Sequence, residues 1–248
     1  MGRTDGERVM DAMASYLADW APRLLEGAFL TLALTAASFS GACALGLFLE
    51  AMRTSRSPGL RRFVSFYVWA LRAIPLLIVL YLIYFVLPGF GLTLSPFLAG
   101  TVGLVLVHGA YVAEVLRAGM QTVEQGQWEA ARALGLTRLQ ALRLVITPQA
   151  VRRVFGPLIV ALTALLKDSS VCALIGVNEL TLASRSIMSE SFMPLHVFLL
   201  AGLFYLALGW PTAVIARAIE RRTTAPWVGK RKRYRGPNVS ARAAPLAR

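Results

Sequence analysis

The sequence predicts an all-α integral membrane protein whose chain crosses the bilayer about five times. Three observations predict this fold class: 56% of the 248 residues are hydrophobic, the mean hydropathy is +0.60, and the apolar residues gather in long stretches. Soluble domains contain about 45–50% apolar residues. A helix of about 20 residues spans the hydrocarbon core and satisfies its own backbone hydrogen bonds there. The stretches are apolar on every side, whereas strands of a membrane barrel alternate apolar and polar residues.

The apolar stretches divide the chain into expected spans and connecting segments. The spans lie near residues 27–49, 63–87, 95–115, 154–177 and 197–216, within a transmembrane domain over residues 23–219. Small residues in the first span, among them Gly41 and Gly46, predict close helix packing. Pro75 and Pro211 are expected to bend the second and fifth spans. The loop over residues 117–153 is long and rich in helix-favouring residues, so we expect it to be a working part.

The distribution of the net charge of +13 predicts the orientation. With the amino terminus outside, the inside segments hold 20 of the 26 Lys and Arg residues and the outside segments hold five. Because cytoplasmic loops carry an excess of these residues, we expect segment 1–22 to be extracytoplasmic and the basic tail 220–248 to be cytoplasmic. Contact with anionic lipid explains the basic run at residues 230–235. Membrane lipid is therefore an expected partner, and nucleic acid is not.

The long loop contains a segment, residues 126–135, that predicts a short amphipathic helix. Trp128, Ala131 and Leu134 share one face of this helix, while Glu129 and Arg132 lie three residues apart on another face, where we expect them to pair.

A glycine follows this helix. Gly135 can take the left-handed conformation that ends one helix and starts a second. In the second helix an apolar stripe continues through Leu139, Leu142 and Val145. From composition alone, the two helices either dock into a groove on another protein or lie among the lipid headgroups.

The pattern of Glu-Ala-Ala, three residues, Gly135, nine residues and a hydrophobic-x-x-Pro ending resembles the EAA loop of ABC importer permeases. Val145 and Thr147 stand where this motif usually has Ile and Leu. Three further segments resemble the polar amino-acid branch of that family: residues 72–77, 109–117 and 166–170. The branch more often has Gly-Thr where this chain has Ala73 and Ile74. The matches lie in the family's order and cover residues 27–217.

The resemblance implies the type I ABC importer permease fold, in the bacterial cytoplasmic (inner) membrane. It implies a permease subunit that imports a polar amino acid or a related small zwitterion. It also implies three partners: a cytoplasmic ABC ATPase dimer, a second permease copy or paralogue, and an extracytoplasmic substrate-binding protein. The coupling residues would be Trp128, Glu129, Ala130, Ala131, Gly135, Leu136 and Pro148.

ATP hydrolysis is expected on the partner rather than on this chain. The sequence has no Gly-x-x-x-x-Gly-Lys-Ser/Thr phosphate loop. We therefore expect no catalytic residue, cofactor or metal in this chain, and ATP with Mg on the ATPase.

Ionisable residues inside the expected spans are candidates for the substrate pathway, because an unpaired charge in lipid is costly. Lys167 and Asp168 lie in the fourth span, followed by Ser169 and Ser170. Either the two charges stabilise each other or mark an interrupted helix, or Asp168 faces the translocation cavity and receives a cationic group of the substrate. Arg72 either snorkels to the headgroups or belongs to the same pathway.

Other residues and other functions have simpler interpretations. His108 is isolated, so we expect a packed, hydrogen-bonded histidine rather than a metal ligand. Glu114 and Arg117, three residues apart, are expected to pair with each other or with the loop. Permeation of another small polar solute, such as an opine or compatible solute, is the alternative within the class. An ion-coupled secondary transporter would need an inverted repeat, and none is visible. An intramembrane enzyme would need clustered catalytic groups, which two His and two scattered Cys do not provide.

Overall fold

The chain folds as a bundle of long helices. The structure is a computed structural model that describes residues 5–123 and 125–223. No strand occurs among them, which confirms the all-helical expectation. The helices are α1 (Asp5–Arg53), α2 (Pro58–Ala73), α3 (Leu76–Tyr81), α4 (Pro96–Gln121), α5 (Gln125–Ala133), α6 (Arg138–Ala141), α7 (Thr147–Asp168), α8 (Leu180–Ser191) and α9 (Pro194–Thr223). Residues 224–248, with most of the expected basic tail, lie outside the described residues.

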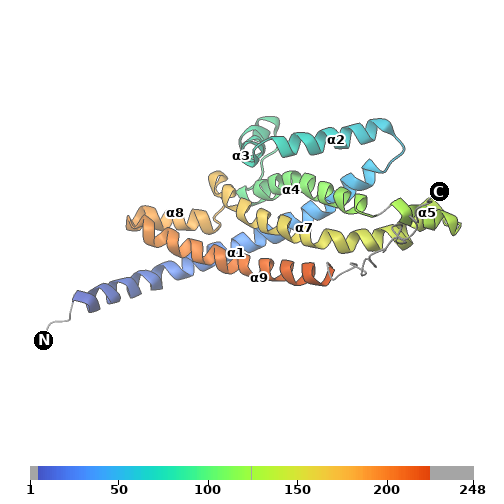
Figure 1. Cartoon of the computed structure of the whole chain (residues 1–248). Coiled ribbons are helices and arrows are strands. Elements are labelled where there is room, and N and C mark those ends of the chain that lie inside the picture. The colour runs from blue at the N-terminus through green and yellow to red at the C-terminus, as the bar shows by residue number, and fades with distance from the viewer. Residues whose placement is uncertain (1–4, 124, 224–248) are drawn as a thin grey trace, which may run out of the picture.

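Four parallel or antiparallel segments form the body of the bundle. Figure 1 shows α1, α4, α7 and α9 running side by side, with α5 at one end and α8 at the other. The segments that are long and apolar enough to cross a membrane are Ala18–Arg53, Pro96–Gln121, Arg138–Ile175 and Pro194–Ile215. These correspond to the expected first, third, fourth and fifth spans.

The second expected span is not one continuous helix. The chain bends by 104° between the helix that ends at Ala73 and the apolar segment Leu76–Phe90. Pro75 causes the break, because it lacks an N–H and disfavours the helical conformation at the residue before it. Ile74 is accordingly extended, with φ −85° and ψ 131°. The predicted bend at Pro75 is confirmed, and the bent pair counts as a fifth span if both arms together cross the membrane.

The first helix is longer than its expected span. It continues through Pro22, so the expected boundary between segment 1–22 and the membrane domain is not a break in the chain's secondary structure. Where α1 crosses α4, a Cβ added to Gly46 would lie 2.5 Å from Val112, and one added to Gly109 would lie 2.7 Å from Leu45. These close approaches confirm that small residues serve helix packing here.

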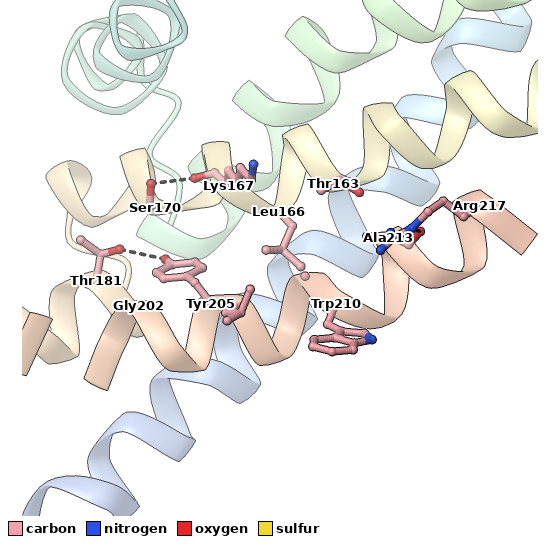
Figure 2. Close-up of a pocket in the computed structure, with 12 residues that line it drawn as sticks. Thr163, Leu166, Lys167, Ser170, Thr181, Gly202, Tyr205, Trp210, Ala213 and Arg217 are labelled. Atoms are coloured by element: carbon pink, nitrogen blue, oxygen red, sulfur yellow. Dashed lines mark hydrogen bonds between the residues drawn. The ribbon is translucent and has the colours of Figure 1, made fainter. Parts of the chain in front are cut away.

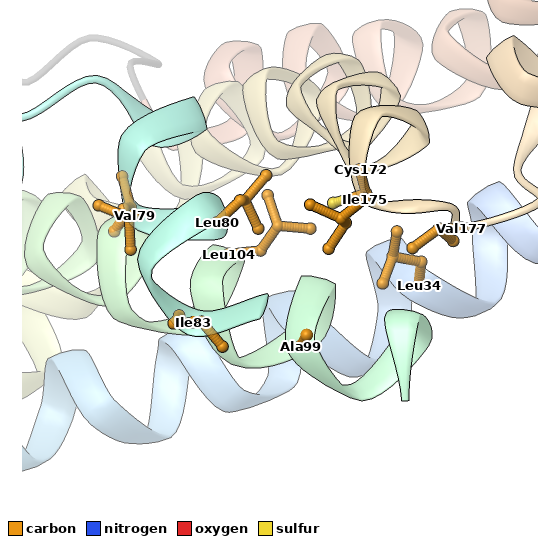
Figure 3. Close-up of a cluster of buried hydrophobic side chains, with 10 residues drawn as sticks. Leu34, Val79, Leu80, Ile83, Ala99, Leu104, Cys172, Ile175 and Val177 are labelled. Carbon is orange, nitrogen blue, oxygen red and sulfur yellow. The ribbon is translucent and has the colours of Figure 1, made fainter. Parts of the chain in front are cut away.

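An apolar cluster fixes the end of α7 against its neighbours. It joins Leu34 of α1, Val79 and Leu80 of α3, Leu104 of α4, and Cys172 in the 3-10 turn Ser169–Ile175 (Figure 3). Leu80 and Leu104 are fully buried. The cluster therefore holds the bend at Pro75 and the residues after Asp168 in one place, and between them lies the candidate site.

A buried carboxylate fastens α8 to the bundle. Glu179 caps α8, where its Oε1 accepts hydrogen bonds from the backbone N–H groups of Thr181 and Leu182 at 2.9 and 3.0 Å. Its Oε2 accepts from the Tyr205 hydroxyl of α9 at 2.7 Å and from the Thr31 hydroxyl of α1 at 3.4 Å. Burial raises the pKa of Glu179, which lies beyond the fourth span. One side chain thus ties together three helices.

Candidate functional site

The end of α7 separates the two charges that the sequence places side by side. The α-helix stops at Asp168, the chain continues as a 3-10 turn, and Gly176 ends that turn with φ +87°. The α-helix thus changes to a 3-10 helix directly after the two charges, and the helical segment continues to Ile175. Consecutive side chains of a helix point about 100° apart. Lys167 and Asp168 accordingly line different cavities. They form no ion pair with each other within 4 Å.

Asp168 lines a cavity of about 840 Å³ that we call the central pocket. The bend between α2 and α3 forms one wall, and α4 and α7 form the others. Most of the lining is apolar, with Pro75, Val107 and Val160 among its residues. Its polar side chains include Arg72, His108, Tyr111 and Asp168. A largely apolar cavity with a few convergent polar groups is the usual form of a small-molecule site.

Asp168 and His108 form a polar pair in this pocket. His108 Nε2 lies 3.0 Å from Asp168 Oδ2. The histidine side chain is only 4% exposed, whereas the aspartate side chain is 48% exposed. The prediction that His108 is packed and hydrogen-bonded is confirmed. Its partner was not predicted from the sequence, because no spacing rule joins two residues that lie on different helices and 60 positions apart.

Arg72 brings a cation to the pocket from the last turn of α2. Its Cζ atom lies 5.3 Å from the centroid of the Tyr111 ring, a cation–π contact. Among the described residues, no carboxylate lies within 4 Å of its guanidinium. The side chain is exposed. Arg72 is thus held by an aromatic ring while its hydrogen-bond donors stay available.

Three of the five pathway candidates do not belong to the central pocket. Lys167 and Ser170 line a separate groove of about 690 Å³ between α7 and α9 (Figure 2). There the Ser170 hydroxyl donates to the Lys167 carbonyl at 2.7 Å. Ser169 is buried and donates to the Leu166 carbonyl at 2.7 Å. Of the expected set, the structure therefore brings only Arg72 and Asp168 together.

The long loop forms two helices joined by a left-handed glycine. Gly135 has φ +73°, as predicted. The N–H of Leu136 bonds to the carbonyl of Ala131 at 3.1 Å, and the N–H of Gly135 bonds to that of Arg132 at 2.9 Å. This pattern closes the end of α5. A capping box starts α6, because Thr137 and Gln140 each accept a hydrogen bond from the other's backbone N–H. The sequence carries the Thr-x-x-Gln signal of this capping box at residues 137–140.

The apolar side chains of the loop divide between two surfaces. Ala131 is buried, and Trp128, Leu142 and Val145 pack on a small core formed by Val123, Ile146 and Ala150. The predicted stripe through Leu139, Leu142 and Val145 is divided, because Leu142 and Val145 pack on this core while Leu139 does not. A π-turn over Leu142–Ile146 rotates these side chains inward. Leu134 and Leu139 remain exposed, at 78% and 56%.

The remaining loop candidates lie at the surface. Glu129 and Ala130 are exposed on α5, Leu136 is half-buried, and Pro148 stands exposed in the first turn of α7. Glu129 and Arg132 form no ion pair within 4 Å, so the expected pairing is wrong. Trp128 and Arg132 instead line a surface hollow of about 370 Å³ with Gln125 and Arg138. The expected pair of Glu114 and Arg117 is confirmed, with Arg117 Nε donating to Glu114 Oε1 at 3.0 Å.

Comparison with known proteins identifies the family. Residues 42–225 match the family described as binding-protein-dependent transport system inner membrane component. A probable glutamine ABC transporter permease protein, GlnM of Bacillus subtilis (strain 168), is 35% identical over 198 residues, which cover 80% of this chain and 92% of that protein. A probable amino-acid ABC transporter permease protein of the same organism, YckA, is 34% identical over 201 residues, covering 81% and 89%.

Solved structures show the same fold. A chain of a crystal structure described as an amino acid ABC transporter with histidines has a TM-score of 0.80 and 33% identity, and the match covers 83% of this chain and 96% of that one. A chain of the MetNI methionine ABC transporter in an inward-facing conformation has a TM-score of 0.64 and 24% identity, covering 79% and 95%. The second likeness concerns the fold alone.

Proposed function

The chain belongs to the family of binding-protein-dependent transport system inner membrane components and is the permease subunit of an ABC importer. We propose that it carries a polar amino acid or a related small zwitterion through the central pocket. Two of the relatives above are named for amino-acid or glutamine transport. The observation that carries the proposal is the pair of opposite charges, Arg72 and Asp168, on the lining of one largely apolar cavity.

The two charges match the two ends of a zwitterion. A guanidinium binds a carboxylate through two parallel N–H groups, so Arg72 would hold the substrate carboxylate. The half-exposed carboxylate of Asp168 would receive the ammonium group, and His108 orients it from behind. The apolar lining excludes water and strengthens both contacts. The volume of about 840 Å³ lies within the range of roughly 300–1,000 Å³ that is usual for small-molecule pockets, so an amino acid with a polar side chain can enter.

The loop around Gly135 would transmit the energy for transport. The exposed Leu134 and Leu139 are apolar side chains on a short helical hairpin at one end of the bundle (Figure 1). Such side chains suit a partner surface, and a groove on an ATPase would provide one. The assembly would contain an ABC ATPase dimer that binds ATP and Mg, a second permease copy or paralogue, and an extracytoplasmic binding protein. In the bacterial inner membrane this loop would lie in the cytoplasm, which the charge count supports.

Substitution of Asp168 tests the substrate site. Asp168→Asn keeps the shape of the side chain and removes the charge, so the ammonium group loses a charge-assisted hydrogen bond worth about 1.5–3 kcal/mol. We expect the KM for amino-acid uptake to rise roughly 10- to 150-fold. Asp19→Asn makes the same chemical change on the exposed side of α1 and should leave uptake unchanged. Membrane insertion and assembly are checked by co-purification. Unchanged uptake in Asp168→Asn would show that Asp168 has a structural role and does not bind the substrate.

A further inference from the structure

Another charged cavity lies between the end of α1 and the helices α2 and α4. This cavity, the arginine groove, has a volume of about 420 Å³. Its polar and aromatic lining consists of Arg53, Ser65, Trp69, Arg72, Glu114 and Arg117. Arg72 stands on the boundary with the central pocket, but the other side chains of the groove do not line that pocket. The transport mechanism proposed above does not use them.

The groove carries more positive than negative charge. Glu114 is already engaged, since Arg117 donates to it at 3.0 Å and Arg53 at 3.5 Å. The nearby Glu50 lies 3.8 Å from Arg53. Three guanidinium groups therefore face two carboxylates, and Arg72 reaches neither of them within 4 Å. An anion bound between Arg72 and Arg117 would balance this charge and accept hydrogen bonds from both side chains.

The groove lies near the ends of two membrane helices, where we expect lipid headgroups. Arg53 is the last residue of α1, and Arg117 lies one helical turn before the end of α4 at Gln121. Ser65 and Arg72 lie seven residues apart on one face of α2, about 10 Å along the helix axis. The groove therefore begins near the ends of two membrane helices and runs a short way toward the interior. Its end of the bundle also carries α5 (Figure 1), which the charge count predicts to be cytoplasmic.

The surface beside the groove is suited to acyl chains. Phe63, Phe66 and Trp69 lie three residues apart along α2 and are each more than half exposed. The rings of Phe66 and Trp69 lie 5.9 Å apart, so they form a continuous aromatic stripe. Three large aromatic side chains in contact with water would be costly, whereas contact with lipid is favourable. Tryptophan in particular prefers the boundary between headgroups and acyl chains.

We propose that the arginine groove binds the phosphate headgroup of one anionic glycerophospholipid, whose acyl chains lie along the stripe of Phe63, Phe66 and Trp69. The charge excess calls for an anion, and the adjoining aromatic stripe favours a lipid over a free anion. A second copy of the chain fits this face less well. Packing of two copies about a two-fold axis would bring their arginine clusters together. The cytoplasmic leaflet also supplies anionic lipids.

Lipid retention by the purified full-length chain tests this site. Native mass spectrometry in detergent, with added phosphatidylglycerol or phosphatidylcholine, counts the lipids that stay bound. We expect one phosphatidylglycerol per chain to be retained more tightly than phosphatidylcholine. Ser65→Asp places a negative charge in the groove at an exposed helix position and should weaken this binding about fivefold, the effect of one charge near the surface. Arg117→Gln should weaken it similarly.

Two controls separate charge from location. Ser65→Asn changes the same side chain without adding charge and should retain the lipid. Ser189→Asp adds the same charge on the exposed face of α8, away from the groove, and should also retain it. Equal retention by Ser65→Asp and Ser65→Asn would overturn the proposal.

Two further outcomes would overturn the lipid assignment. Displacement of the lipid by inorganic phosphate at the same concentration would show a site for a small anion. Disulfide cross-linking of Trp69→Cys between two chains, with Cys43 and Cys172 replaced by Ala, would place a second copy over the groove instead. We expect no such cross-link in membranes, because lipid covers this position.

Discussion

Replacement of Gly135 tests whether the turn between α5 and α6 couples the permease to its ATPase. Gly135 has φ +73°, and a Cβ added there would meet no atom within 4 Å. Gly135→Val therefore creates no clash, and its cost is the backbone strain of about 1–2 kcal/mol for a residue forced into the left-handed conformation. That cost lowers the fraction of loops with the observed turn by roughly 5- to 30-fold.

The assay is co-purification of a tagged ATPase together with amino-acid uptake. We expect Gly135→Val to reach the membrane at the normal level, to lose most of the bound ATPase and to abolish transport. Gly135→Asn should give an intermediate result, because Asn tolerates positive φ better than Val. Glu129→Lys should weaken the ATPase contact more mildly, since it alters an exposed charge and leaves the turn intact.

A matched control exists in the same loop. Gly126 lies in α5 without positive φ, and a Cβ added there also meets nothing within 4 Å. Gly126→Val makes the same chemical change without backbone strain and should keep both ATPase binding and uptake. Normal binding and uptake in Gly135→Val would refute this reasoning, and so would an equal loss in Gly126→Val.

Three further predictions concern orientation, substrate and stability. An impermeant thiol reagent applied to intact cells should label Phe192→Cys, between α8 and α9, and should not label Leu134→Cys. The reverse labelling pattern would show that the chain has the opposite orientation in the membrane. Arg72→Lys keeps the charge but loses the planar fork, so it should raise the KM for amino-acid uptake, and Arg72→Gln should raise it further; equal KM values would remove Arg72 from the site. Burial raises the pKa of Glu179, so the contribution of this residue to stability is complete below the ordinary carboxyl pKa and is lost as the pH rises through the raised pKa. The midpoint of thermal unfolding should therefore fall with rising pH more steeply in the wild type than in Glu179→Gln. Parallel curves of the midpoint against pH would contradict this.

The sequence predicted the features that depend on local patterns. Apolar stretches gave four of the spans, because a membrane helix must be apolar over its whole length. Two backbone features were predicted from single residues: the left-handed turn at Gly135 and the break at Pro75. Glycine permits positive φ and proline restricts φ whatever their neighbours are. The spacing of Glu114 and Arg117 gave their ion pair.

Features that depend on tertiary packing were not predictable from local patterns. Glu179 follows the fourth span in a short polar segment that reads as an ordinary loop, yet four hydrogen-bond donors from three helices converge on it. The π-turn that rotates Leu142 and Val145 inward has no recognised sequence signal. The expected ion pair of Glu129 and Arg132 does not form, and Arg132 lines a hollow with Trp128.

The charged residues of the spans divide into separate tasks once their partners are known. Glu114 accepts hydrogen bonds from Arg117 and Arg53, and Asp168 is held by His108 but stays half exposed. Arg72 has an aromatic partner and no acidic one among the described residues, and it lines both the central pocket and the arginine groove. A lipid phosphate in the groove and a substrate carboxylate in the pocket would therefore compete for one guanidinium. It follows that Ser65→Asp, which weakens the lipid, should lower the KM for uptake if both sites act as proposed, and Ser65→Asn should not.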